Sequence, residues 1–520
     1  MHVALRIPEV ISIVCGCLQG DPATLHGQPL VNFALTCRTF VEPAQDALWE
    51  EMPHLYCLFR CLPDDSMIRC PSPNDWDRPL YHASRVRRIL STPPRAFGYS
   101  ISNDLLDAVG SSCPTEVLLP NLQSIYIPYQ MVNASTSFPR LLISPTLTEI
   151  NIDLSESQTP AQHTSLLWSL VDSRCRLTSL SLDRNGHLSL YPQSLLDALE
   201  AIVTRSPQLE YLAVPCLSTE ALKCVASYPR LQYLHLKTSA FHQPCISGDL
   251  LPLHDIEDDF PALTWLELAN TTASHAAWLL SMMYNSPSTS LEIYLTGPAS
   301  ASAWSPIFQR VGNIAGHPGK TLNLRFDEMD IPGSSTELPL PLITVNHLEP
   351  LFRRTDVSTF ALRACSAIID DEFVDKVATA WPMLMSLDLG DFNPALQTPT
   401  MTLGGLTTLV RSCRRLSCTP TFPIDVSNVP AATVEESALV GGAWNVRVDS
   451  ICVGNSPMFS NPAAVATYLS FLFPNLESIL ASVTVSEGWR QVEALLPFLK
   501  QAQRQGFLLG RMNSGNTTGV

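Results

Sequence analysis

Three residues near the start of the chain have the spacing of metal ligands: His54, Cys57 and Cys61. Imidazole and thiolate groups bind zinc, but a tetrahedral site normally takes four donors, and no fourth donor is near these three in the sequence. On a helix they would share a face with Leu58, which favours a buried helical face over a metal site. We therefore predict no metal site and no cofactor.

A second stretch, residues 316–321 with the sequence Gly-His-Pro-Gly-Lys-Thr, has the ending of the phosphate-binding pattern G-x-x-x-x-G-K-[ST]. The first glycine of that pattern would be residue 314, which is Ile314. Residues 322–326 read as a strand, whereas the pattern needs a helix after the lysine. The signatures H-E-x-x-H, G-x-S-x-G and G-x-G-x-x-G are absent. The sequence predicts binding and no catalytic residues, with nucleotide hydrolysis at Lys320 as the least favoured alternative.

Composition bounds the class of protein. The chain has 520 residues, of which 46% are hydrophobic and 15% charged, so it can fold around a large core. Its net charge of −16 argues against electrostatic binding to nucleic acid or anionic lipid and favours a basic partner. The cysteines form no evenly spaced framework, which predicts a reducing compartment, the cytoplasm, the nucleus or both. No apolar run approaches the roughly 20 residues of a membrane span.

The first sixty residues read as three short helices. Pro8 suits the first turn of a helix along which Ile11, Val14 and Leu18 recur at helical spacing. The apolar residues of the second helix are Leu30, Phe33, Ala34 and Cys37. Pro43 is expected to open the third helix, which leads to Trp49. A unit of roughly 40 residues is rarely stable alone, so it should bind a partner.

Four segments of this region, in this order, resemble an F-box of the fungal type. They are residues 5–10 (LRIPEV), 35–40 (LTCRTF), 47–49 (ALW) and 58–63 (LFRCLP). Residues 76–89 (WDRPLYHASRVRRI) resemble the segment that follows the F-box in the same proteins. The chain departs from the pattern in having a longer first loop, residues 20–29, and almost nothing before the motif.

The resemblance implies a non-catalytic subunit of a Skp1-cullin-F-box ubiquitin ligase. The three helices would bind a Skp1-type adaptor, which bridges to a cullin and a RING protein, while the rest of the chain selects the protein to be ubiquitinated. The residues expected in or beside the adaptor groove are Pro8, Ile11, Leu18, Leu30, Phe33, Cys37 and Trp49. Some of them must instead hold the helices together, and the sequence does not sort the two sets. Truncation of Trp49 is expected to matter most, because aromatic anchors dominate interfaces.

From about residue 114 an internal repeat begins, in which a helical stretch ends near a proline or cysteine and leucines at strand spacing follow. The strands begin after Leu122, Leu147, Leu177, Leu209, Leu231, Leu263, Leu384 and Leu476. The intervals reach slightly beyond the 20 to 29 residues of a leucine-rich repeat, and only residues 177–185 match its pattern fully. Two stretches, residues 195–203 and 373–381, carry helical spacing. Because each unit leaves an apolar face for its neighbours, the units should stack into a curved solenoid.

The predicted fold class is therefore α/β: a three-helix F-box followed by an irregular leucine-rich-repeat-like solenoid, or horseshoe. The predicted boundaries are an F-box at 1–62, a hinge and linking helix at 63–113, a target-binding solenoid at 114–506 and a disordered tail at 507–520. Long connections at 238–260, 297–320, 327–340 and 418–442 are expected around the target site. The main alternative function is a leucine-rich-repeat scaffold that does not direct ubiquitination.

Overall fold

The computed structural model places the chain in two compact units, Met1–Ser247 and Gly248–Val520. The residues that it describes are 7–19, 28–63, 70–90, 101–128, 131, 138–154, 160–183, 191–237, 260–316, 319–329, 342–364, 367–390, 399–417, 419–430, 444–458, 461–482 and 486–515. Within this part of the chain, no helix is long and apolar enough to cross a membrane.

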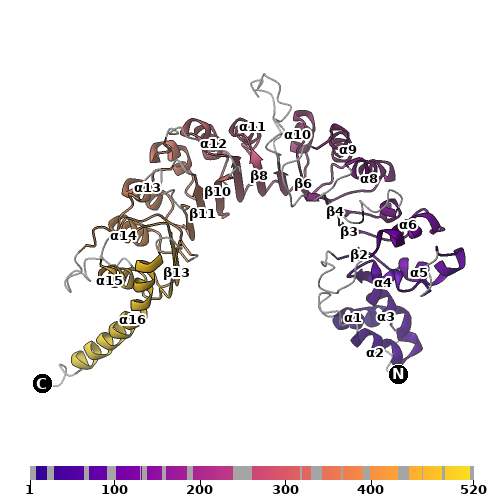
Figure 1. Cartoon of the computed structure of the whole chain (residues 1–520), viewed down its shortest axis with the longest axis horizontal. Helices are drawn as coiled ribbons and strands as arrows, with labels where there is room; N and C mark the ends of the chain where they lie inside the picture. The colour runs from indigo at the N-terminus through magenta and orange to yellow at the C-terminus, as the bar shows by residue number, and fades with distance from the viewer. Residues whose placement is uncertain are drawn as a thin grey trace. The chain divides into compact units, whose positions relative to one another are not determined.

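The first unit begins with three helices, α1 (Pro8–Leu18), α2 (Gln28–Thr36) and α3 (Arg38–Glu50), which lie together at its start (Figure 1). Pro8 occupies the first turn of α1, as predicted. The prediction that Pro43 opens the third helix is wrong, because α3 starts at Arg38 and contains Pro43. The reason is tertiary: the extra turn buries Phe40, whose ring stacks on that of Phe33 with centroids 4.4 Å apart.

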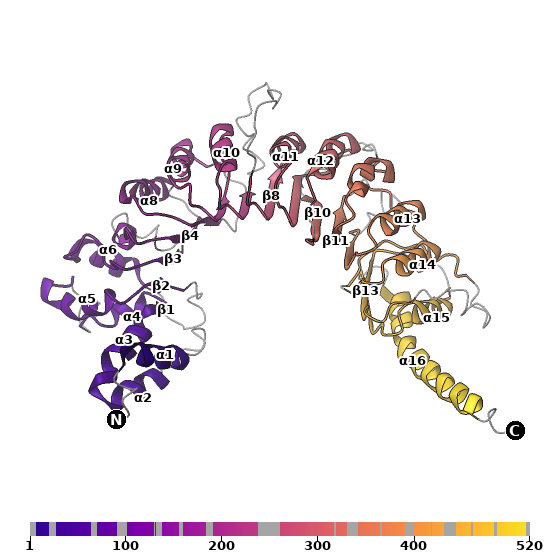
Figure 2. The same cartoon turned by 180° about the vertical axis from the view of Figure 1, so that it is seen from behind.

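In the described part of the first unit, seven parallel strands follow. Each strand pairs with the next one along the chain. The strands are β1 (Glu51–Met52), β2 (Arg88–Ile89), β3 (Ser124–Ile127), β4 (Glu149–Asp153), β5 (Ser179–Asp183), β6 (Tyr211–Val214) and β7 (Tyr233–Lys237). The intervening helices are α4 (Tyr56–Phe59), α5 (Asp77–Ala83), α6 (Asn103–Ser112), α8 (Pro160–Ser173), α9 (Gln193–Thr204) and α10 (Thr219–Ala226), with 3₁₀ helices η4 (Pro73–Trp76) and η6 (Phe138–Leu142). Helices α8, α9 and α10 cover one side of the strands (Figure 2).

The second unit repeats the same alternation. Its strands are β8 (Trp265–Thr271), β9 (Ser290–Thr296), β10 (Leu322–Met329), β11 (Val357–Arg363), β12 (Ser386–Asp388), β13 (Ser450–Gly454) and β14 (Ser478–Ala481). Its helices are α11 (Ala273–Ser281), α12 (Ala301–Asn313), η7 (Val345–Arg353), α13 (Asp371–Ala380), α14 (Leu403–Ser412), α15 (Pro462–Leu472) and α16 (Ser486–Gly515). Thr421 bridges Asp388 of β12 and Cys452 of β13, so the parallel ladder continues between them.

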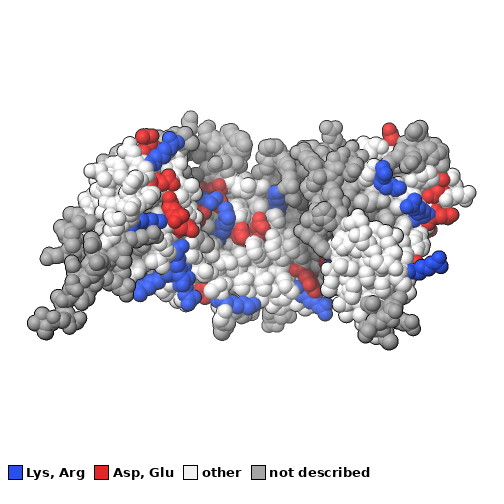
Figure 3. Space-filling model, turned by 90° about the horizontal axis from the view of Figure 1, so that it is seen from below, with Lys and Arg blue, Asp and Glu red and all other residues white. Residues whose placement is uncertain are grey.

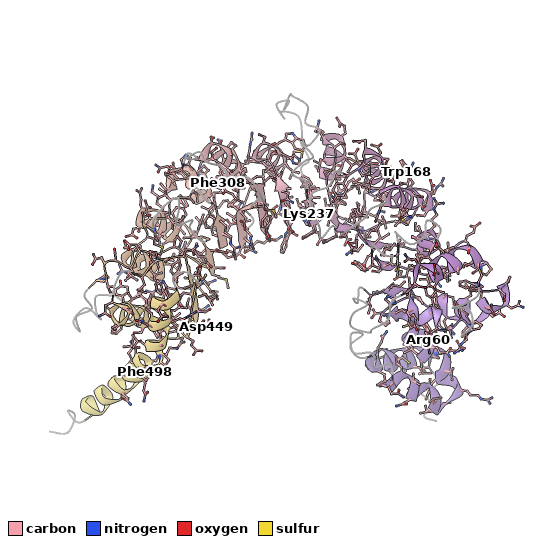
Figure 4. All side chains as sticks on the ribbon, viewed as in Figure 1. Arg60, Trp168, Lys237, Phe308, Asp449 and Phe498 are labelled. Carbon is pink, nitrogen blue, oxygen red and sulfur yellow. The ribbon has the colours of Figure 1, made fainter. Side chains whose placement is uncertain are left out.

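The core lies between the strands and the helices. Leading leucines such as Leu209 and Leu384 are fully buried. As predicted, each lies at the turn between a helix and the next strand. The amide of Leu209 donates to the carbonyl of Ser206, and that of Leu384 to the carbonyl of Trp381. Figure 4 shows Lys237 at the strand layer and Trp168 at the helix layer of the first unit. This order of strand and helix is an α/β solenoid of the leucine-rich-repeat type.

Three predicted boundaries differ from the structure. The parallel ladder starts at β1, inside the predicted F-box, and β2 lies in the predicted hinge 63–113. These strands are too short to show alternation in the sequence. Residues 297–320, expected as a connection, contain α12, in which Trp304, Ile307, Phe308 and Val311 are buried at helical spacing and Pro306 lies inside the helix. Helix α16 continues to Gly515, beyond the predicted start of a disordered tail at 507.

Candidate functional site

Helix α1 carries two apolar stripes. One faces the other two helices, where Ile11 and Cys15 are 2% and 1% exposed. The other has spacing i, i+3, i+4, i+7 and consists of Val10, Ile13, Val14 and Cys17. Ile13 is 67% exposed, and a side chain added at Gly16 would meet no atom within 4 Å. Among the described residues, this second stripe lies outside the core of the three helices.

Helix α2 repeats this arrangement over a shorter length. Leu30 is 1% exposed and belongs to the core of the three helices. Val31 and Leu35, one turn apart, are 38% and 80% exposed, and Ile7 at the N-terminus of α1 is 43% exposed. Large aliphatic side chains at these exposures each leave apolar area that burial would stabilise at about 25 cal/mol per Å². We call Ile7, Val10, Ile13, Val14, Cys17, Val31 and Leu35 the outward surface.

The structure sorts the residues predicted for adaptor binding. Ile11 and Leu30 lie in the core of the three helices, so their assignment to a partner groove is corrected. Leu18, Phe33 and Cys37 are partly buried against that same core. Pro8 is exposed. The outward residues Ile13 and Leu35 were missed, although their helical spacing was readable from the sequence.

Trp49 packs against its own chain. Its indole stacks on the imidazole of His82 in α5, with ring centroids 4.3 Å apart. Burial, together with the positive charges of Arg85 and Arg78, lowers the pKa of His82, so a neutral ring faces the indole. Trp49 therefore links α3 to α5 and is half-buried.

Charged groups strengthen the same link. Arg85 forms ion pairs with Glu42 and with Asp46, whose Oδ1 lies 3.1 Å from the arginine Nε. Tyr81 donates a hydrogen bond of 2.8 Å to Glu42, and the guanidinium of Arg85 lies over the Tyr81 ring, 4.4 Å from its centroid. Such a network fixes α3 on α5, so the outward surface is carried on a fixed base.

The residues considered for metal and phosphate binding have other surroundings in the structure. Among the described residues, no group of three His, Cys, Asp or Glu side chains could hold a metal. The Nδ1 of His54 accepts a hydrogen bond from the Tyr56 amide, and burial raises the pKa of Cys57 and Cys61, which keeps both thiols protonated. Lys320 lies two residues before β10, the strand that the sequence predicts there.

The strand faces of the two units differ in chemistry. In the first unit, Tyr211 of β6 and Tyr233 of β7 stack with centroids 4.4 Å apart. In the second, Arg363 pairs with Asp388 at 2.5 Å and with Asp327 at 3.9 Å. Burial raises the pKa of Asp327, against the effect of the neighbouring guanidinium groups. Figure 3 shows acidic and basic side chains interspersed on the face that it draws. Neither sign of charge dominates that face.

Most of the long connections expected around a target site lie outside the described residues. Only residues 260, 297–316, 319–320, 327–329, 419–430 and the ends of neighbouring strands can be placed. Asn185, predicted to bond the turn of the most regular repeat, also lies outside them, as does most of the first loop, residues 20–27.

The chain matches no protein-family model and no curated protein. Among solved structures it is similar to that of the Rad7 and Elc1 complex in yeast, with 11% identity over 89% of this chain and 95% of that one and a TM-score of 0.33. It is also similar to the leucine-rich repeat-containing protein LegL7 from Legionella pneumophila, with 12% identity over 76% and 96% of the two chains and a TM-score of 0.27. These scores carry no argument about function.

Proposed function

We propose that the chain is the target-recognition subunit of a Skp1-cullin-F-box ubiquitin ligase. Helices α1 to α3 would bind the Skp1-type adaptor, and through it the cullin and RING protein. The repeats would hold the protein target near the charged ubiquitin enzyme, so the chain supplies proximity and no catalytic group. The proposed locations are the cytoplasm and the nucleus.

One observation supports this proposal above the others: the outward surface lies on helices that already have a core of their own. Isolated exposed apolar residues are normal on a protein surface, but a second stripe at helical spacing opposite a buried one is the mark of a helix that packs on two sides. The F-box resemblance includes residues 8–10 at the start of α1 and residues 35–40, which run from the end of α2 into α3.

The adaptor-binding part is proposed to be residues 7–50, shorter than the predicted 1–62, because Glu51 already belongs to the strand ladder. Ile13 and Leu35 would be its main contacts, with Pro8, Leu18, Phe33 and Cys37 beside them. The target would bind the repeats, where the strand faces present a tyrosine stack and a series of ion pairs. The runner-up, a scaffold that binds an adaptor without directing ubiquitination, shares this surface.

The test is co-purification of the full chain with a Skp1-type adaptor. Ile13→Asp and Leu35→Asp should each reduce adaptor binding at least tenfold, because each would bury an unpaired charge in the interface. Ser12→Asp and Asn32→Asp place the same charge on the exposed neighbouring residues and should bind normally. Circular dichroism of all four variants establishes that they are folded. If Ile13→Asp and Leu35→Asp bind the adaptor as well as Ser12→Asp and Asn32→Asp do, the outward surface is not the adaptor-binding surface.

Two further measurements separate the alternatives. A cullin in the adaptor complex and turnover of a bound protein would support the ligase, whereas an adaptor complex without either would support the scaffold. The Ile13→Asp chain should still hold its targets while escaping the ligase, so affinity mass spectrometry on it would identify them. Lys320→Ala should leave adaptor binding intact, and a nucleotide-dependent melting shift that this variant loses would support an enzyme instead.

A further inference from the structure

A cavity of about 580 Å³ lies in the first unit, where α8 and α9 end. Its wall is formed by the last turns of the two helices and by the turns that lead from them to β5 and β6, residues 174–177 and 205–208. The volume falls within the roughly 300 to 1,000 Å³ that ligand pockets occupy. The cavity is distant in sequence from α1 to α3 and forms no part of the outward surface.

The repeat explains why the cavity is there. The third residue before each leading leucine is here named the plug position. It is buried in every such repeat but one: five repeats place a large residue there, Leu119, Tyr228, Phe260, Trp381 and Phe473, and two place the small residues Ser144 and Ser206, all at most 3% exposed. In the repeat led by Leu177 the plug position holds Arg174, which is exposed. The space that a buried side chain fills elsewhere is therefore open.

Arg174 also has an unusual backbone conformation. Its φ is 54°, in the left-handed region that favours glycine, where a side chain costs on the order of 1 kcal/mol. Phe260, at the same position of its repeat, has a φ of 49°. There the strain is offset by a ring that is 1% exposed, whereas the exposed Arg174 gains no such burial. Arg174 therefore differs from the residues at the other plug positions in both exposure and charge.

Three guanidinium groups line the cavity, those of Arg174, Arg176 and Arg205, and none of the lining residues is acidic. Arg205 donates one hydrogen bond of 3.3 Å to the carbonyl of Val171 at the end of α8. Within the described part of the chain, no ion pair or hydrogen bond engages the guanidinium of Arg174 or Arg176. The remaining wall combines apolar residues, among them Leu170 and Ile202, with the polar Ser206 and Gln208.

We infer that this cavity binds a small organic anion that carries a carboxylate or phosphate next to an apolar group. Arginine offers paired donors that match both anions, and such charge-assisted bonds are about twice as strong as neutral ones. The apolar wall would cover the rest of the ligand. The cavity is positively charged, whereas the whole chain has a net charge of −16. The net charge alone would favour basic partners. The inference does not depend on the adaptor.

Calorimetric titration of the full chain tests the inference with four probes. Phenyl phosphate and phenylacetate carry both features, inorganic phosphate carries only the charge, and phenol carries only the ring. At least one of the first two should bind at least tenfold more tightly than inorganic phosphate and phenol, and added salt should weaken it. The stronger of the two identifies the anion as phosphate or carboxylate.

Three variants complete the test. Arg176→Gln should weaken binding about tenfold or more, because it removes one charged partner. Arg230→Gln is the matched control: it precedes Leu231 as Arg176 precedes Leu177, but it does not line the cavity. Arg174→Phe restores a plug and should abolish binding while melting at or above the temperature of the unchanged chain. Equal loss in the Arg176 and Arg230 variants, a lower melting temperature for Arg174→Phe, or no preference for the organic anions would overturn the inference.

Discussion

The three N-terminal helices and the strand-helix repeats bury their apolar residues to different extents. In the repeats, each apolar face is covered by the next unit, and residues such as Trp304 and Trp381 are completely buried. In α1 and α2 a small core around Ile11 and Leu30 is complete, yet Ile13 and Leu35 remain exposed. A repeat is stabilised by its neighbours within the chain, whereas these helices retain apolar surface after folding.

This difference shows that the exposure of an apolar residue is informative only when the core of its own helix is already complete. A single exposed leucine carries little information. An exposed isoleucine on a helix whose opposite stripe is 1% to 2% exposed indicates a second packing partner. The exception among the repeats, Arg174, works in the opposite way, because a position that is buried elsewhere is open there and charged.

The largest expected effect tests how completely the repeats are packed. Trp381→Ala should destabilise the second unit by about 3 to 5 kcal/mol, as large-to-small changes in a core do. Its ring is fully buried beside Phe360, and its Nε1 donates a hydrogen bond of 2.7 Å to the carbonyl of Arg354. Trp444→Ala, at a residue that is 60% exposed, is the control and should change stability by about 0.5 kcal/mol or less. Denaturant unfolding gives both values, and similar losses would contradict the comparison.

A pH-dependent effect should come next in size. Burial lowers the pKa of His275 in α11 from 6.5 to about 4. Between these values the unfolded chain takes up a proton that the folded chain does not, so stability falls as the pH is lowered from 6.5 to 4. The full loss from this group is about 3 kcal/mol.

The His275→Gln variant isolates the contribution of His275 to the pH dependence of stability. Its unfolding free energy should fall less steeply with acidification than that of the unchanged chain, so the difference between the two proteins should shrink or reverse below pH 6.5. The Oγ1 of Thr271 lies 3.2 Å from Nδ1 of His275 and gives the glutamine a partner. Parallel curves for the two proteins would show that His275 does not titrate as its burial requires.

The sequence predicts the repeats better than their ends. Leucines such as Leu180 and Leu234 alternate with more polar residues, and that period of two is enough to place β5 and β7. Strands of two residues, such as β1, have no period to read, and their pairing is set by the whole sheet. Helix α12 was missed because its internal residue Pro306 is ordinarily a helix breaker, although Trp304 and Phe308 have helical spacing.

The candidate sites were predictable only in part. The sequence marks α1 and α2 as apolar, but which of two stripes faces inward depends on where α3 lies, and Phe40 of α3 decides that. Trp49 is predicted at an interface because it is aromatic, and its stacking on His82, from a helix more than thirty residues away, has no signal in the sequence. Arg174 could have been noticed by aligning the turns before each leading leucine, because the other turns place an apolar or small residue there.

The smallest expected effect tests the helical side of the comparison. Leu30→Ala should cost about 2 kcal/mol, at the low end for a buried leucine, because a small core has room to relax around the cavity. The loss should be local: hydrogen exchange should speed up in α1 to α3 and stay unchanged in β8 to β12, since elements of low stability open separately. Leu35→Ala, at an 80% exposed residue, should leave exchange unchanged. If Leu30→Ala instead speeds exchange throughout the repeats, the three helices do not have a core of their own, and the exposed stripe loses its meaning as a surface for a second molecule.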